Sequence, residues 1–388
     1  MLDSFLRQVT KDSYGPVSFQ EKTLFPVIVH KFHEAISVLN WGKMPDPLQD
    51  RGRINALVFS KLNEKFLSQD SWKDFLRSPD ALAFRKAGAS IQQSGNVSST
   101  LNELAEKLPI HSTYLGAVDE AHFKALDGKN SLARTDLISA SYFDQSFDKL
   151  PMVYPVSEYI AEEKVPTSTV MGRAVWDYSI WKQQAGVKVL PFEFLCHFTL
   201  TDASLKRLNV ESVSLPKAAS LQTLQAGTTW DFPVIELVLP QDPFERRMGL
   251  SHALWVTGFS AEFLQKTLLS AAWIAAFTRY YTPGMNLNSV KLRFALDAQG
   301  RLLLHDSFTL DDLHLEKEGR NLHVDSAIEF YQRTSWYESA MHAKHHAETF
   351  GLNEWKRLVA EPAPFLDPKF KLKLEADLQE IAKQFLGK

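Results

Sequence analysis

The sequence contains a single cysteine, Cys196, among its 388 residues. One cysteine excludes a disulfide within the chain and a cysteine-rich zinc site, and it is typical of a protein in a reducing compartment. No apolar run approaches the roughly 18 residues that a membrane-spanning helix needs. The first fifteen residues carry an early acid and no continuous apolar core, so we expect no secretory signal and a cytoplasmic location.

Neither sign of charge dominates the sequence. Forty-three basic and 46 acidic residues leave a net charge of −3 at pH 7 and a pI near 6.5. Without a basic surplus we expect no nucleic-acid or membrane partner, and the substrates would be small molecules, with a homo-oligomer left open. The hydrophobic fraction of 45% provides enough apolar side chains for a large core.

The length predicts two to three domains at about 150 residues each, or one two-lobed unit. We place an N-terminal α+β lobe at 1–116 and a larger α+β lobe at 117–359. A stiff linker, "AEPAP", and a final amphipathic helix follow at 360–388.

Strand and helix patterns are mixed along the chain. Runs of β-branched and aromatic residues predict strands at 23–32, 188–200 and 231–240. Helical spacing of apolar residues predicts helices at 53–67, 260–281, 324–349 and 368–386. For the second of these, Ser260 is the expected N-cap and Pro283-Gly284 the stop. Because no regular β-α-β order appears, the expected fold class is α+β rather than a doubly wound sheet.

Residues 290–316 read as a hairpin that runs into acids. Apolar and polar side chains alternate over 290–296, "DAQG" makes the turn, and the return strand ends at Asp306, before Asp311 and Asp312. A carboxylate at a strand end is where Mg²⁺ would be held together with phosphates. Acids after a strand are also common as solvated turn formers, and the residues alone leave both interpretations open.

The hairpin resembles a region of the SAICAR synthetase family (phosphoribosylaminoimidazole-succinocarboxamide synthase). That region reads D-x-K-x-E-F-G, a D-x-x-G turn, D-E, then S/T-P-D-x-x-R. Family positions are occupied here by Lys291, Phe294, Asp306, Thr309 and Asp311.

Further segments resemble the family, in the family's order. Residues 35–54 share Ser37, Gly42, Pro45, Asp46 and Gly52 with its substrate-site stretch. "IHSTYLG" resembles its T-H-x-x-G region, and 190–208 keeps Glu193 and Ser204 of a strand and phosphate loop.

The resemblance implies a two-lobed α+β fold with an ATP cleft between the lobes and a C-terminal helix. It implies a ligase of purine biosynthesis that uses ATP and Mg²⁺ to join aspartate to the carboxylate of a carboxyaminoimidazole ribotide. Lys291 and Asp306 would be catalytic, with Asp306 as the Mg²⁺ ligand, and Glu193 would join them at the nucleotide. The implied substrate-binding residues are Ser37, Asp46, Ser204, Arg207 and Asp311.

Several polar positions depart from the family pattern. Glutamates are replaced by Arg293 and Ser307, arginines by His197 and His314, an aspartate by Asn40, a lysine by Arg51, and glycines by Ala203 and Ala295. A kept apolar pattern with a changed polar site also fits two alternatives. One is a catalytically degenerate homologue that binds a nucleotide or a protein, and the other is a ligase for a different substrate.

Two smaller features carry alternatives of their own. His342, His345 and His346 would share one helical face, which could bind a transition metal or could be ordinary surface. Cys196 lies in the middle of a predicted strand without a neighbouring base, and we expect it to be a buried apolar residue.

Overall fold

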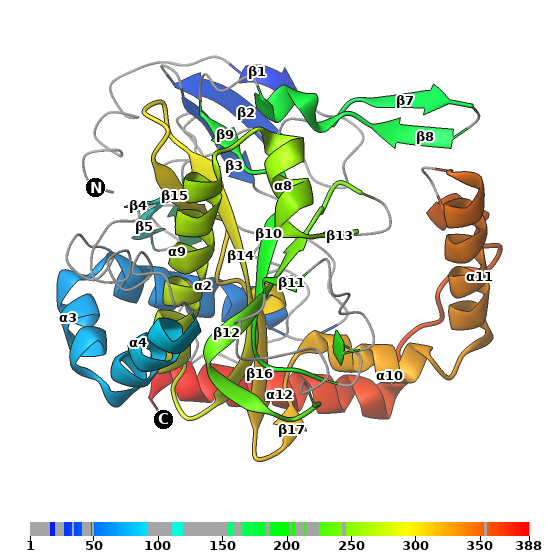
Figure 1. The fold of residues 1–388 in the computed structure, drawn as a ribbon. Coiled ribbons are helices and arrows are strands. Elements are labelled where there is room, and N and C mark those ends of the chain that lie inside the picture. Colours follow the sequence, from blue (N-terminus) through cyan, green and yellow to red (C-terminus); the bar gives the residue numbers. More distant parts are fainter. Residues whose placement is uncertain are drawn as a thin grey trace.

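The computed structural model describes residues 16–19, 27–32, 35–40, 48, 50–91, 111–118, 154–157, 165–171, 173–182, 187–201, 204–205, 213–214, 225–242, 246–352 and 355–387. Helices and antiparallel strands are mixed through these ranges, which confirms the α+β class (Figure 1). None of the described helices is long and apolar enough to cross a membrane.

Ten of the described strands form one mixed sheet. They are β4 (His111–Ser112), β9 (Lys188–Val189), β10 (Glu193–Thr199), β11 (Val213–Ser214), β12 (Thr229–Val238), β13 (Arg247–Met248), β14 (Asn286–Leu296), β15 (Leu302–His305), β16 (Leu313–Lys317) and β17 (Arg320–Asn321). The main path runs β11-β12-β10-β14-β15-β4, with β9 and β16 also paired to β14. The pairing of β15 with β4 is parallel and the other pairings are antiparallel.

Seven more strands form small antiparallel units. They are β1 (Pro16–Phe19), β2 (Val27–Phe32) and β3 (Ala35–Asn40), then the pair β5 (Tyr114–Val118) and β6 (Tyr154–Ser157), and the hairpin β7 (Thr167–Val170) and β8 (Arg173–Trp176). The strand predicted at 23–32 is β2, which begins at Val27.

The helices predicted at 53–67, 260–281 and 368–386 are confirmed, whereas the helices at 69–77, 79–91 and 250–257 were not predicted. The described helices are α2 (Arg51–Leu67), α3 (Gln69–Arg77), α4 (Pro79–Ile91), α8 (Leu250–Thr257), α9 (Ala261–Tyr280), α10 (Ile328–Tyr331), α11 (Ser335–Phe350) and α12 (Pro368–Leu386). Short 3₁₀ turns are η2 (Tyr178–Lys182), η5 (Leu310–Asp312), η6 (Val324–Ala327) and η7 (Trp355–Leu358). Ser260 caps α9 as predicted, since its hydroxyl accepts the Phe263 N–H at 3.1 Å.

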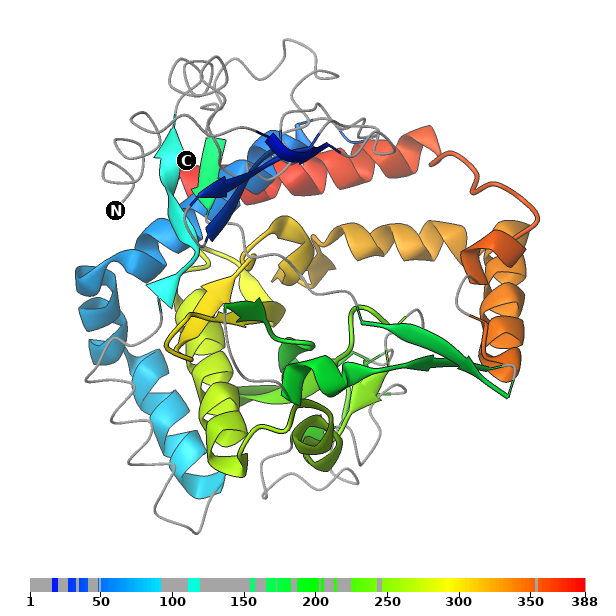
Figure 2. The same cartoon turned by 90° about the horizontal axis from the view of Figure 1, so that it is seen from above.

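The prediction of one continuous helix over 324–349 was wrong, because the chain there forms three shorter elements, η6, α10 and α11. The break lies at Thr334, whose hydroxyl accepts the Tyr337 N–H at 3.3 Å and starts α11 anew. Figures 1 and 2 show α11 standing apart from the main sheet, while α12 lies alongside α2.

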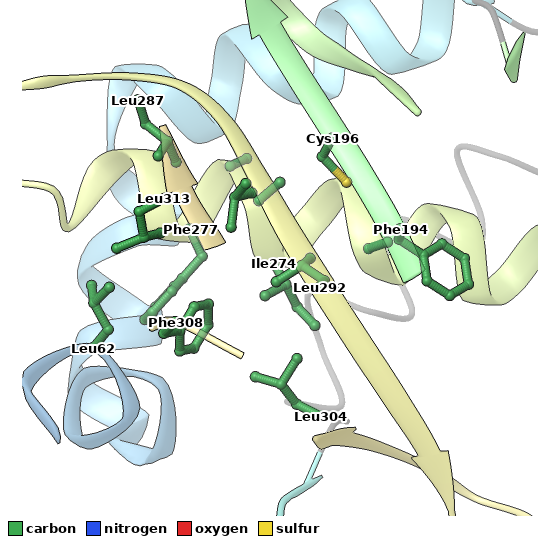
Figure 3. Close-up of a cluster of buried hydrophobic side chains, with 14 of the residues drawn as sticks. Leu62, Phe194, Cys196, Ile274, Phe277, Leu287, Leu292, Leu304, Phe308 and Leu313 are labelled. Atoms are coloured by element: carbon green, nitrogen blue, oxygen red, sulfur yellow. The ribbon is translucent and has the colours of Figure 1, made fainter. Parts of the chain in front are cut away.

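One large core joins the described helices to the sheet. Helix α9 packs on β10, β12 and β14 and is buried over most of its circumference. Trp72 of α3 stacks on Phe277 of α9, with ring centroids 4.1 Å apart. Figure 3 shows Phe277 among side chains from the sheet and from α2. The core includes residues from Leu48 to Ala382, and the two boundaries between the three predicted segments stay a prediction.

The two central strands present different chemistry on their two faces. Phe194, Cys196 and Phe198 of β10 point into the core, as do Val290, Leu292 and Phe294 of β14. Because side chains alternate along a strand, the residues between them lie on the opposite face. Cys196 is fully buried, and burial raises the pKa of its thiol, which confirms the expected apolar role.

We expect Phe277→Ala to lower the free energy of unfolding by about 3–5 kcal/mol, because the smaller side chain leaves a cavity among aromatic rings. Denaturant unfolding followed by circular dichroism measures the loss. Phe365→Ala is the matched control, because that ring is 99% exposed. A loss at Phe277 no larger than at Phe365 would contradict the assignment of the core.

Candidate functional site

A group of charged side chains lies on the sheet face that points away from α9. Arg293 donates through Nε to Glu193 Oε1 at 2.5 Å, and a second guanidinium nitrogen contacts the same oxygen. Lys291 Nζ lies 4.0 Å from that oxygen and 3.3 Å from Asp312 Oδ1. Lys291 and Arg293 stand two residues apart on β14, so the strand period places both cations on one face.

Asp312 is the buried acid of this group. One of its carboxylate oxygens accepts the Thr309 N–H at 2.9 Å and the Thr309 hydroxyl at 2.6 Å, which completes a capping box around η5. Burial raises the pKa of Asp312, while the nearby Lys291 ammonium opposes the rise. The carboxylate therefore fixes the turn and orients Lys291 at the same time.

Asp306 and Phe308 flank Ser307 at the end of β15 with unusual backbone angles. Their φ values are +44° and +79°, a left-handed region that costs non-glycine residues on the order of 1–3 kcal/mol each. The Phe308 ring is buried near Phe66, and the Ser307 hydroxyl accepts the Arg293 N–H at 2.9 Å and donates to the His305 carbonyl at 3.0 Å. These contacts hold the strained turn against β14.

Helix α2 holds the far side of the same turn. Asn55 Oδ1 accepts the Leu310 N–H at 2.7 Å, and Arg51 forms an ion pair with Asp311. Asp311 is 54% exposed and Asp312 is buried, so two neighbouring acids have different roles. Asp311 tethers the turn to α2, and Asp312 supports the cation on β14.

The same face continues along the neighbouring strands with histidines. Strand pairing aligns His197 of β10 and His314 of β16 on either side of Ser289 of β14. His197 Nε2 lies 3.5 Å from Glu236 Oε2, which also receives Arg247 Nε at 3.4 Å. His197 and His314, which both replace a family arginine, therefore lie in one row across the sheet, on either side of Ser289.

His314, His323 and Asp325 are the one group of three metal-capable side chains found among the described residues. Their geometry does not suit a metal. The two imidazole rings stack with centroids 4.0 Å apart and planes 16° apart, so in-plane lone pairs do not converge on one point. His323 Nδ1 already accepts the Asp325 N–H at 3.1 Å as a helix cap.

The described part of the chain provides few carboxylate ligands for Mg²⁺ at this face. Asp306 keeps its carboxylate, which lies 3.7 Å from His305 Nε2, but belongs to no cluster of metal-capable side chains there. Ser307 uses its hydroxyl on backbone groups, and Glu193 is bonded to Arg293. One carboxylate together with phosphates can hold Mg²⁺, so Asp306 suits an ion that arrives with a nucleotide.

The other predicted site residues lie elsewhere or outside the described residues. Ser204 is buried, and its hydroxyl contacts Thr201 at 3.0 Å. Ser37 lies in β3, with its side chain outside the description, and Asp46 and Arg207 are not described. The structure therefore brings Glu193 and Lys291 together and leaves the ribotide-binding assignments as predictions.

Sequence reasoning missed the parts that Arg293 and Asp312 play at the site. In the family pattern Arg293 is only a departure, although its spacing of two from Lys291 predicts that both lie on one strand face. Asp311, and not Asp312, falls on a family position, but the T-x-x-D spacing from Thr309 to Asp312 is a sequence signal of a capping box.

Two other features lie outside this face. His342, His345 and His346 are all exposed on α11, and none belongs to a metal-capable group of three among the described residues. An apolar pocket of about 450 Å³ lies between α11 and the segment after it, lined in part by Trp336, Trp355 and Pro362. Nothing in the structure shows what fills it.

The fold and this face define an α+β protein with two cations held over buried acids on a sheet. Among curated proteins, a protein of Archaeoglobus fulgidus provisionally named phosphoribosylaminoimidazole-succinocarboxamide synthase is 21% identical over 340 residues. The match covers 87% of this chain and 81% of that protein. No protein-family model matches the chain.

Two solved structures also align with most of the chain. SAICAR-synthase from Saccharomyces cerevisiae complexed with SAICAR is 8% identical with a TM-score of 0.44, covering 96% of this chain and 99% of that one. SAICAR synthetase (Type-2) in complex with ADP is 13% identical with a TM-score of 0.37, covering 90% and 100%. Both TM-scores lie below 0.5, so neither likeness bears on the chemistry of the site.

The curated relative and the ordered motifs agree along most of the chain. The chain resembles the SAICAR synthetase family over most of its length, at the distance of a divergent relative.

We expect Asp312→Asn to change how stability depends on pH. Because burial raises the pKa of Asp312 above its ordinary 3.8, the folded state binds this proton more tightly than the unfolded chain. The protonated Asp312 side chain therefore contributes fully to the free energy of unfolding below its ordinary pKa, and this contribution declines as pH rises. Urea unfolding of both proteins from acid to neutral pH measures the difference, wild type minus variant, which should fall with rising pH.

The control is Asp311→Asn, which makes the same change at the exposed neighbouring position. Loss of its exposed ion pair should cost no more than about 1 kcal/mol. A wild-type advantage over Asp312→Asn that grows with pH would show that Lys291 outweighs burial at this carboxylate.

Proposed function

We propose that this protein is an ATP-dependent carbon–nitrogen ligase that joins an amine to a carboxylate in purine biosynthesis. The substrates that its family suggests are aspartate and a carboxyaminoimidazole ribotide. The observation that carries the proposal is the 21% identity to a provisionally named phosphoribosylaminoimidazole-succinocarboxamide synthase over 87% of the chain. The cationic face of β14 supports it, because the chemistry needs positive charge where phosphate is transferred.

The proposed reaction has two balanced steps. A carboxylate oxygen of the acid attacks the γ-phosphorus of ATP, which forms an acyl phosphate and releases ADP. The amine nitrogen then attacks the acyl carbon, phosphate leaves with the bonding electrons, and the nitrogen loses a proton as the amide forms. Both steps develop negative charge on phosphate oxygens, which a positioned ammonium or guanidinium stabilises.

The residues present have distinct proposed roles in this scheme. Lys291, held by Asp312, would contact the transferring phosphoryl group, and Glu193 would orient both cations. Mg²⁺, when bound, would neutralise phosphate charge, and Asp306 is the residue that would hold it. Ser37, Asp46, Ser204, Arg207 and Asp311 stay the proposed contacts of the acid and the amine.

A second candidate function, nucleotide binding without turnover, is favoured by a separate observation. Arg293 and Ser307 stand where the family has glutamates, and the structure engages both in bonds within the protein. A homologue that binds nucleotide without turnover would show the same change. His197 and His314 at arginine positions favour, in the same way, a ligase for a different acid.

We expect ADP release by the full chain to require the ribotide acid and aspartate together. A coupled assay would compare the complete mixture with mixtures that lack the acid or the amine. Lys291→Gln should lower kcat/KM by about a hundredfold or more, because it removes charge at the transferring phosphoryl group. Lys61→Gln on the exposed side of α2 is the matched control and should leave turnover unchanged.

The possible results separate the candidates. ADP release with another acid or amine would identify a different ligase. Nucleotide binding without turnover on any acid–amine pair would favour the degenerate homologue over the ligase.

A further inference from the structure

The charged group on β10, β14 and η5 is layered by depth. Its two cations are the outer members, since the side chains of Lys291 and Arg293 are each 28% exposed. Its two acids are the inner members, since the side chains of Glu193 and Asp312 are 10% and 5% exposed. A molecule that reaches this face from solvent therefore meets ammonium and guanidinium groups before it meets carboxylates.

The inner acids also fix where the cations stand. Glu193 takes two nitrogens of the Arg293 guanidinium, and Asp312 and Glu193 both lie within 4.0 Å of Lys291 Nζ. Lys291 and Arg293 are two residues apart on a strand, which places their backbones about 7 Å apart on one face. A pair of cations held in this way suits a ligand with several anionic oxygens, such as a polyphosphate.

The same contacts leave few carboxylates available for a metal. Mg²⁺ at Glu193 Oε1 would have to compete with the Arg293 guanidinium, which already contacts this oxygen. Position 307 carries no acid, and the Ser307 hydroxyl is bonded to the backbone of β14 and β15. Arg293 and Ser307, which replace two family glutamates, therefore both make the site less suited to a metal. Arg293 adds a fixed positive charge, and Ser307 removes a possible metal ligand.

We infer that Arg293 supplies to the phosphates of a bound nucleotide much of the positive charge that Mg²⁺ would otherwise supply, so that nucleotide binding persists without the metal. The inference rests on the proposed function, in which this face binds ATP. It goes further because it assigns the phosphate contact to a residue that the family pattern does not have, and it changes the cation requirement of the site.

Calorimetric titration of ATP into the full chain tests the inference, in one buffer with excess Mg²⁺ and in another with EDTA. We expect the Kd of the wild type to differ by no more than about threefold between the buffers, because the guanidinium stays in place. Arg293→Gln should raise the Kd in EDTA by about tenfold to a hundredfold, the loss of one charge-assisted hydrogen bond. Added Mg²⁺ should recover part of that loss.

Three further variants serve as controls for the loss at Arg293. Arg301→Gln removes an exposed arginine from the same hairpin, where it pairs with Asp297, and should leave both Kd values unchanged. Arg293→Lys keeps the charge, and its Kd in EDTA should lie between those of the wild type and Arg293→Gln. Lys61→Gln removes an exposed cation on α2, away from this face, and should also leave the Kd in EDTA unchanged. Circular dichroism checks the fold of each variant, and if Arg293→Gln does not fold, the wild type and Arg293→Lys decide.

Two results would overturn the inference and can be told apart. Loss of more than about a hundredfold in wild-type affinity on adding EDTA would show that the metal carries the phosphate contact, with the proposed function intact. Absence of ATP binding in both buffers would contradict the proposed function itself, and the inference with it.

Discussion

The pairing of β14 with its neighbours is the constraint on which the rest of the structure depends. Four strands pair with it, and its alternate side chains serve two environments. Val290, Leu292 and Phe294 complete the core against α9, while Lys291 and Arg293 lie on the other face. A slip of one residue would exchange the two sets and bury both cations in the apolar core, so the register of this strand is held by both faces at once.

The charges on the outer face are arranged at some cost to stability. Burial disfavours the ionised form of Asp312, which is the reason that its pKa is raised. Left-handed backbone at Asp306 and Phe308 adds strain in the same turn. The apolar contacts of Phe308 and the hydrogen bonds of Ser307 and Thr309 offset these costs locally. Strain and a buried acid beside two half-buried cations are typical of a site shaped for a ligand.

Local signals explain how far the fold could be predicted. The capping residue Ser260 fixes the start of α9, and the alternation over 290–296 identifies β14. The long helix expected over 324–349 fails because the hydroxyl of Thr334 competes for the backbone, and apolar spacing does not report that choice.

Pairing across the sheet could not be predicted in the same way. The contact of Glu193 with Arg293 joins residues 100 positions apart, and no local pattern encodes it. The family pattern includes Glu193, Lys291 and Asp311 but not Asp312, which the structure places 3.3 Å from Lys291 Nζ. Only the fold shows that the histidines at 197 and 314 share one line across β14.

The lone thiol of this protein has a practical use. Cys196 lies at the centre of β10, enclosed by the core, and its raised pKa keeps it as an unreactive thiol at neutral pH. A thiol-specific dye can therefore reach it only when the β10–β14 pairing opens, and one labelling site means one clean kinetic signal. The rate of labelling would measure, without any engineered probe, how often the pairing of β10 with β14 opens.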